Sequence, residues 1–401
     1  MDKPGSRALI ILLTALVALG PVSISLYIPS MPALGAAFGA PPALVQQSFT
    51  IFLASFAAAQ LVYGPLADRY GRRPVLIWGL FLYIAASLAC ALSTKIDAFL
   101  AARLAQGLGA GVGPVVARAV VRDRFERSDA VRAFAFIGIA IALAPALGPL
   151  VGGFLEVWFG WRSTFLFLVG YGCIMTALVL TRLVETIPLR DLRATNPVRL
   201  IRNYAGLLSD VRYMAYLTPL AFSFGGVFAY NAAAPFLCIE RLGLAPDRFG
   251  MLAIFTVGAY TMGSWLAGRL EGRLSVRGTV TTSLAAILLA AVLMLSLAGE
   301  LSLPRLIGPM MLYVFGFGLL IPAATAAAMQ PFPHIAGSAS ALIGFLQMGM
   351  GATGSLIISW VYDGAAGSLG YLMILMALLG IVGFLGLGKI VMASDNATGE
   401  S

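Results

Sequence analysis

Charge is scarce in this chain. Only 11% of its 401 residues are charged, whereas 60% are hydrophobic, and the mean hydropathy is +0.93. Soluble domains are about half apolar and a quarter charged, so most of this surface must face something other than water. Apolar segments of about 20 residues, enough to cross ~30 Å of hydrocarbon, recur from end to end. The composition predicts a polytopic, all-α membrane protein whose main partner is the lipid bilayer.

Histidine and cysteine are also rare, which limits the chemistry available. The single histidine, His334, falls in a predicted loop, where we expect a structural role. Cys90, Cys173 and Cys238 stand far apart, without the spacing of a metal site or a disulfide framework. The chain has no HExxH pair, no nucleophile elbow and no Walker loop. We therefore expect neither an enzyme nor an ATP-driven pump, and we expect no metal and no cofactor. A receptor is not expected either, because no segment outside the membrane spans is long enough to form a binding domain.

The net charge of +9 does not indicate nucleic-acid binding, because the arginines have a regular placement. They cluster in alternate gaps between apolar segments: Arg69, Arg72 and Arg73; Arg122, Arg124, Arg127 and Arg132; Arg190, Arg193, Arg199 and Arg202; Arg269, Arg273 and Arg277. Positive charge stays on the cytoplasmic side of a membrane. These gaps, and both termini with Lys3, Arg7 and Lys389, are thus predicted to be cytoplasmic.

The hydrophobic pattern predicts twelve membrane spans in two halves. The expected spans are 7–29, 44–66, 74–94, 98–120, 131–155, 162–184, 212–237, 247–268, 277–297, 304–328, 338–361 and 367–391. The longest polar gap, residues 185–211, is predicted to be a cytoplasmic linker between a half at 1–184 and a half at 212–401. The stretches GPLADRYGRR at 64–73 and SWLAGRLEGR at 264–273 show a faint internal repeat. Parallel repeats of this kind place a substrate site near the midplane, between the halves.

The strongest motif is GPLADRYGRRPVL at 64–76, in the gap after the second span. Gly64 and Gly71 are expected to allow close approach of the backbone in a tight turn. Asp68 stands among three arginines at the membrane boundary, where it can pair with Arg72 or meet a helix N-terminus. A loop that only set topology would explain the arginines, but not the ordered spacing of glycine, aspartate and glycine.

This stretch resembles the major facilitator superfamily, whose second-to-third helix loop has the pattern G-x-L-a-D-r-x-G-r-k-x-x-l. The resemblance implies two six-helix halves and a loop that latches the gate of the outward-facing state. It also implies that Arg72 pairs with Asp123 at the end of the fourth span, and that Asp68 meets the start of the eleventh. The latch residues implied are Gly64, Asp68, Arg69, Gly71, Arg72, Arg73 and Asp123.

The fourth span contains an arginine about two turns into the membrane, where an unpaired cation is expensive. This residue, Arg103, begins the stretch RLAQG, which is similar to the R-x-x-Q-G motif of the same superfamily. We expect Arg103 to act in the substrate cavity, with a purely structural partner as the alternative. The full set of candidate cavity residues is Ser25, Tyr27, Arg103, Gln106, Tyr230, Asn231 and Gln347.

The fifth span carries ALAPALGPLVGG at 142–153. Proline removes a helical hydrogen bond and bends the helix, while glycine permits close packing against a neighbour. The G-P-x-x-G-G core resembles the antiporter motif of the drug-exporting members of the superfamily, which implies efflux. The motif residues are Pro145, Gly148, Pro149, Gly152 and Gly153.

Four stretches resemble the Bcr/CflA group of drug:proton antiporters: LYIPSMPAL, GPLADRYGRRPVL, VVARAVVRDRF and HIAGSASALIGFLQM. The resemblance implies export of small drugs, such as phenicols and bicyclomycin, by alternating access across the bacterial inner membrane. We expect a monomer that carries a small-molecule substrate. The alternative is a narrow-substrate permease or a metabolite exporter with weak or different coupling.

One residue departs from that group. Its first helix usually reads D-x-Y-L-P, and the Asp is the obvious proton carrier, but Ser25 stands at that position here. Three alternatives remain open for coupling: a peripheral acid such as Glu240 or Glu156, the ionisation of the substrate itself, or weak coupling. A cavity whose only fixed charge is Arg103 is predicted to prefer neutral or anionic compounds over cations.

Overall fold

The protein consists of helices joined by turns and short loops in the part of the chain that the computed structural model describes, which is residues 4–125, 127–187, 191, 194–195, 197–332 and 335–398. Lys3, Arg190, Arg193 and His334, which belong to the sequence patterns above, lie outside these residues. The chain forms two compact units. Unit 1 contains Met1–Asn196 and Gly243–Ala253, and unit 2 contains Pro197–Leu242 and Ile254–Ser401.

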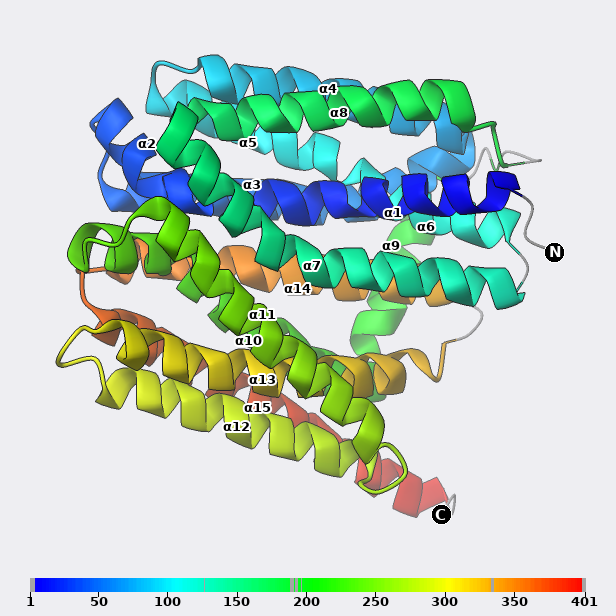
Figure 1. Ribbon diagram of the computed structural model, residues 1–401. Coiled ribbons are helices and arrows are strands. Elements are labelled where there is room, and N and C mark those ends of the chain that lie inside the picture. Colours follow the sequence, from blue (N-terminus) through cyan, green and yellow to red (C-terminus); the bar gives the residue numbers. More distant parts are fainter. Residues whose placement is uncertain are drawn as a thin grey trace. The chain divides into compact units, whose positions relative to one another are not determined.

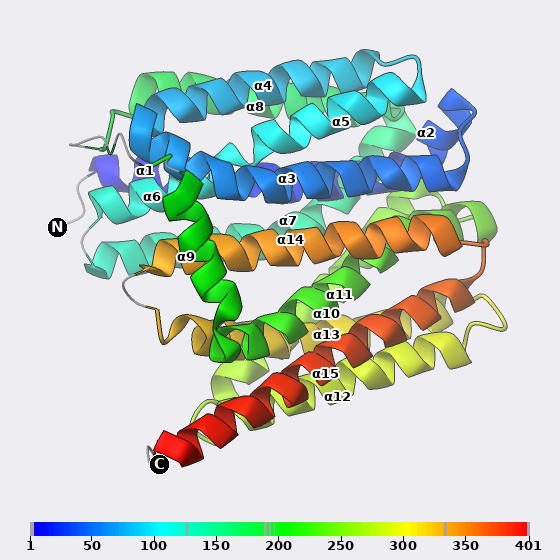
Figure 2. The same cartoon turned by 180° about the vertical axis from the view of Figure 1, so that it is seen from behind.

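Unit 1 holds the helices of the first half, which are coloured blue to green in Figure 1. They are α1 (Pro4–Ser25), η1 (Ile28–Ser30), α2 (Met31–Phe38), α3 (Pro42–Tyr70), α4 (Arg72–Leu92), α5 (Ile96–Ala110), α6 (Val112–Arg124), α7 (Arg127–Phe159) and α8 (Arg162–Arg182). Helices α4 and α8 run side by side in both views (Figures 1 and 2). The α1 helix ends at Ser25, and Pro29, four residues later, has no N–H group to donate to the Ser25 carbonyl.

Unit 2 holds the remaining helices. They are α9 (Pro197–Ser209), α10 (Val211–Pro235), the π-helical turn η2 (Phe236–Arg241), α11 (Pro246–Leu270), α12 (Val276–Ser296), α13 (Leu303–Met329), α14 (Ala336–Val361) and α15 (Ala366–Thr398), with the first turns of α11 belonging to unit 1. Asp210 caps α10, because its side chain accepts a hydrogen bond of 2.8 Å from the backbone N–H of Tyr213.

Twelve helical segments among the described residues are long and apolar enough to cross a membrane. They overlap the predicted spans one by one, so the predicted all-α, twelve-span membrane fold is confirmed. The fourth span consists of two helices, α5 and α6, which meet at Gly111. The division into halves at residues 184 and 212 stays a prediction.

The predicted linker region contains a helix, α9, which crosses α14 at a steep angle in Figure 2. Its Leu207 is buried in an apolar cluster with residues of α10, α13 and α14. Within this cluster the hydroxyl of Tyr213 donates a hydrogen bond of 2.7 Å to the carbonyl of Ala339. The helix α9 is therefore packed into unit 2 through an apolar face, and does not extend freely from it.

Candidate functional site

The turn between α3 and α4 is built around Gly71. Its φ of 105° lies in the region that favours glycine, and a Cβ at this position would lie 2.5 Å from Oε2 of Glu185. Gly64 differs, because a Cβ there would meet nothing closer than a Val115 methyl carbon at 3.9 Å. The close backbone approach predicted for Gly64 is therefore wrong, since this residue lies inside α3 in ordinary packing.

Arg72 connects two carboxylates of the candidate latch. Its side chain is buried, with Nη1 2.6 Å from Oδ1 of Asp68 and Nε 3.1 Å from Oδ2 of Asp123. The ion pair between Arg72 and Asp123 is the one that the family resemblance implied. The contact of Asp68 with the eleventh span stays a prediction, as does the role of these residues as a gate.

Sequence reasoning missed Glu185, which lies three residues beyond the end of α8. Four backbone N–H groups donate hydrogen bonds to its carboxylate: those of Arg72 (3.0 Å), Arg73 (3.2 Å), Thr186 (2.9 Å) and Ile187 (3.2 Å). Partial burial raises the pKa of Glu185, but the four backbone donors lower it by more, so that its pKa lies below the ordinary value. The residue supplies an anionic cap to the N-terminus of α4.

The segment after α8 is tied to the Gly71 turn by further bonds. They run from Nη1 of Arg69 to Oγ1 of Thr195 (2.6 Å), from the N–H of Asp191 to the carbonyl of Asp68 (3.1 Å) and from Oγ1 of Thr186 to Oδ2 of Asp123 (3.4 Å). The only feature of the sequence that could have indicated this contact was the acidic residue Glu185, directly after the predicted sixth span. Residues 185–187 and the described part of 191–195, which belong to the predicted linker, form a strap over the latch.

Arg103 lies on α5 and is fully buried. Its guanidinium carbon is 4.2 Å from the ring centres of both Tyr27 and Phe52, and 5.9 Å from that of Phe165. These distances allow cation–π attraction, which is strongest where water is excluded. Nη1 of Arg103 donates a hydrogen bond of 2.6 Å to Oε1 of Gln106, whereas Nε and Nη2 have no hydrogen-bond partner among the described residues.

A chain of hydrogen bonds leads away from this arginine across α5, α4 and α1. Nε2 of Gln106 donates to Oγ of Ser87 (2.8 Å), and Oγ of Ser87 donates to the carbonyl of Tyr83 (2.7 Å). The Tyr83 hydroxyl lies 2.6 Å from Oγ of Ser23. These groups hold Gln106 and, through it, one edge of the guanidinium, which leaves the other edge of Arg103 with unused donors.

The seven candidate cavity residues do not all come together within one unit. Ser25, Tyr27, Arg103 and Gln106 lie in unit 1 and are all buried, whereas Tyr230, Asn231 and Gln347 belong to α10 and α14 in unit 2. In unit 1 the Tyr27 ring lies directly against Arg103, as described above. A role of any of the seven in substrate contact stays a prediction.

Ser25 is packed against α7 and not left with a free hydroxyl. Its Oγ approaches the carbonyl oxygens of Pro21 (2.8 Å) and Ala144 (3.0 Å), to which it donates. A Cβ on Gly148 would overlap this hydroxyl, and a Cβ on Gly152 would overlap the carbonyl oxygen of Leu26. The glycines of the predicted antiporter motif thus let α7 lie against the end of α1, at the residue that departs from the family pattern.

The other motif residues differ in their surroundings. Pro145 is exposed, whereas Pro149 and Gly153 are buried. A Cβ on Gly153 would lie 2.8 Å from the Cα of Asp247, at the start of α11 in the same unit. The close packing expected of this motif is thus observed at its three glycines, while its part in antiport stays a prediction.

The described residues thus contain twelve segments suited to cross a membrane, a buried arginine and a charged turn between α3 and α4. In a comparison with known families, the model of the Major Facilitator Superfamily matches residues 11–355, and the chain belongs to this superfamily. Its members are transporters and not enzymes, and the predicted likeness to the Bcr/CflA group is confirmed by the relatives that follow.

The chain is 35% identical to multidrug resistance protein D of Escherichia coli over 359 residues, which cover 89% of this chain and 90% of that protein. It is 29% identical to a chloramphenicol resistance protein of Pseudomonas aeruginosa, over 88% of this chain and 84% of that protein. The fold also matches a crystal structure of a bacterial homologue of the lysosomal transporter Spinster, with a TM-score of 0.75 at 13% identity, over 98% and 99% of the two chains.

Proposed function

We propose that this protein exports small drugs or related amphipathic compounds from a bacterial cell by alternating access. The observation that carries the proposal is the 35% identity to a multidrug resistance protein along nearly the whole of both chains. Further support comes from the close packing of α7 on α1 at Gly148 and Gly152, because this is where the sequence resembles the motif of exporters.

The proposed substrates are neutral or anionic. Arg103 is a permanent cation, and two of its guanidinium nitrogens, Nε and Nη2, have no hydrogen-bond partner among the described residues. Its partners are aromatic rings and an amide, and none of these neutralises its charge. Such a site attracts a carbonyl, hydroxyl or carboxylate oxygen and repels a lipophilic cation.

Export is proposed to be coupled to protons through a carboxylate other than the missing one at position 25. Glu156, on α7, is the better candidate of the two peripheral acids. Its Oε2 is buried and has no hydrogen-bond partner among the described residues, whereas Glu240 is exposed. An unpartnered oxygen on a half-buried carboxylate raises the cost of its charged form, and Glu156 is therefore suited to exchange its proton when its surroundings change.

The proposed location is the inner membrane, with both termini in the cytoplasm and the protein acting as a monomer. The clusters of arginine in alternate loops support this orientation. The turn of Gly71 and the strap after α8 then lie on the cytoplasmic side.

Proteoliposomes test the proposal directly. Export predicts that a neutral phenicol drives proton flux in vesicles with the wild-type protein, and that ethidium does so poorly. Glu156→Gln is expected to abolish the proton flux but to keep exchange of labelled for unlabelled drug. Glu240→Gln is the matched control and is expected to keep both activities. Equal transport of ethidium and phenicol would contradict the substrate class, while no transport of any compound by the folded protein would favour a narrow-substrate permease.

A further inference from the structure

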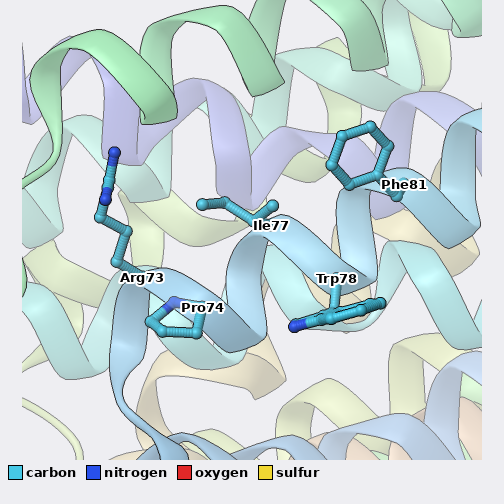
Figure 3. Close-up of a pocket in the computed structure, with 5 residues that line it drawn as sticks. All are labelled: Arg73, Pro74, Ile77, Trp78 and Phe81. Atoms are coloured by element: carbon cyan, nitrogen blue, oxygen red, sulfur yellow. The ribbon is translucent and has the colours of Figure 1, made fainter.

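A groove lies on the outer face of α4, next to the latch. Its volume is about 320 Å³, and it is lined by Arg73, Pro74, Ile77, Trp78 and Phe81. Figure 3 shows the guanidinium of Arg73 at one end and the Phe81 ring at the other, with Ile77 between them. Trp78 is 75% exposed and Phe81 is 54% exposed. Because α4 is a membrane span, large apolar side chains exposed on it face lipid.

The length of the groove fits one leaflet of a bilayer. Arg73 and Phe81 are eight positions apart on a helix, which corresponds to about 12 Å along its axis. Half of a ~30 Å hydrocarbon core is about 15 Å. An acyl chain that lies along Ile77 and Phe81 therefore has its headgroup at the level of Arg73.

The charge of Arg73 is not neutralised within the protein. Its Nη2 donates a hydrogen bond of 2.9 Å to the carbonyl of Leu180 on α8, and its Nε has no hydrogen-bond partner among the described residues. No carboxylate of the described part of the chain forms an ion pair with it. Glu185 is close in the fold but accepts only from the backbone N–H of Arg73. Arg72, by contrast, has two carboxylate partners.

We propose that this groove binds one anionic phospholipid, with the phosphate on Arg73 and an acyl chain along Ile77, Trp78 and Phe81. The lipid supplies the negative charge that the protein lacks at this position, and it covers an apolar hollow in the outer surface of α4. Since Arg73 also joins α4 to α8 and follows the Glu185 cap, occupancy stabilises the junction on which the latch is built. The inference rests on the proposed cytoplasmic orientation of the turn, where anionic lipid is most abundant.

Lipid binding is measured by native mass spectrometry on the delipidated full-length protein in detergent. The probes are phosphatidylglycerol and phosphatidylcholine with identical acyl chains. One arginine at the membrane surface contributes enough electrostatic attraction for about a fivefold preference for the anionic lipid. We expect Arg73→Gln to remove this preference. The matched control is Arg122→Gln, because Arg122 is 64% exposed on α6 and belongs to the same basic side; it is expected to keep the preference.

A second pair of variants leaves the charge in place. Ile77→Trp fills the groove and is expected to lower the retention of both lipids, whereas Ile174→Trp, at an exposed aliphatic residue of α8, is expected to change neither. This pair decides the matter if Arg73→Gln does not fold. The proposal would be overturned if the wild type bound the two lipids equally, or if the two variants of a pair had equal effects. It would also be overturned if millimolar inorganic phosphate displaced the bound phosphatidylglycerol. The measurement involves no transport, so its outcome is independent of the proposed export.

Discussion

Replacing Glu185 by alanine is expected to destabilise the junction of α4 with the segment after α8. The substitution leaves the first two N–H groups of α4, those of Arg72 and Arg73, without their acceptor. Loss of an N-terminal helix cap costs about 0.5–2 kcal/mol, and the charge of this carboxylate places Glu185→Ala near the upper end. Glu185→Gln keeps an acceptor oxygen but loses the charge, and we expect it to lose about half as much.

The assay is thermal unfolding of the purified protein in detergent, followed by intrinsic fluorescence. Glu300→Gln is the matched control, because Glu300 is also a hydrogen-bonded carboxylate, paired with Arg305, but it is exposed in a loop. Exposed pairs of this kind contribute about 0–1 kcal/mol. Glu300→Gln is therefore expected to change the midpoint much less than Glu185→Ala.

The pH dependence gives an independent readout. The pKa of Glu185 is lower in the folded protein than its ordinary value of about 4.3. Its contribution to stability is then fully present above the unfolded pKa, and it is lost as the pH falls through the folded pKa. The stability advantage of the wild type over Glu185→Gln should accordingly be constant above about pH 5 and shrink below about pH 4. Equal stability of the wild type and Glu185→Ala, or an advantage unchanged by acid, would refute this account of the cap.

Three further predictions concern the packing of α1 and α7 and the buried arginine. Gly152→Ala places a methyl group against the Leu26 carbonyl, so it should lower the free energy of unfolding by about 1–3 kcal/mol and abolish export. Gly138→Ala lies on the same helix with open space around it, so it should leave stability unchanged or raise it. Equal effects of the two variants in thermal unfolding and drug susceptibility would argue against the contact. Ser25→Asp puts a carboxylate against two carbonyl oxygens, so it should lower the free energy of unfolding by at least about 2 kcal/mol. It should not increase proton flux in proteoliposomes. A stable Ser25→Asp variant with faster flux would contradict this expectation. Arg103→Ala should abolish drug resistance in an exporter-deficient host at normal membrane abundance, and unchanged resistance would exclude a role in transport.

The membrane fold was predictable because the bilayer imposes a requirement that can be seen in single segments. A span must be long, apolar and helical, and its flanking arginines stay on one side. The pair of Arg72 and Asp123 was also predicted, but through a resemblance to a family and not through any spacing in the chain. The tight packing at Gly71 and Gly152 followed from glycine itself, whereas Gly64 shows that the same residue type does not always mark a close contact.

The hydropathy and charge of the sequence by themselves determined the class of the protein, its twelve spans and its expected orientation, because lipid selects for these properties one segment at a time. Contacts between distant segments were decided only by the tertiary structure. Glu185 meets the start of α4 across more than 100 residues, and Ser25 meets Ala144 across 119. No local pattern predicts such pairs, because a hydrogen bond depends on where two backbones meet in space and not on which residues stand beside each other in the chain.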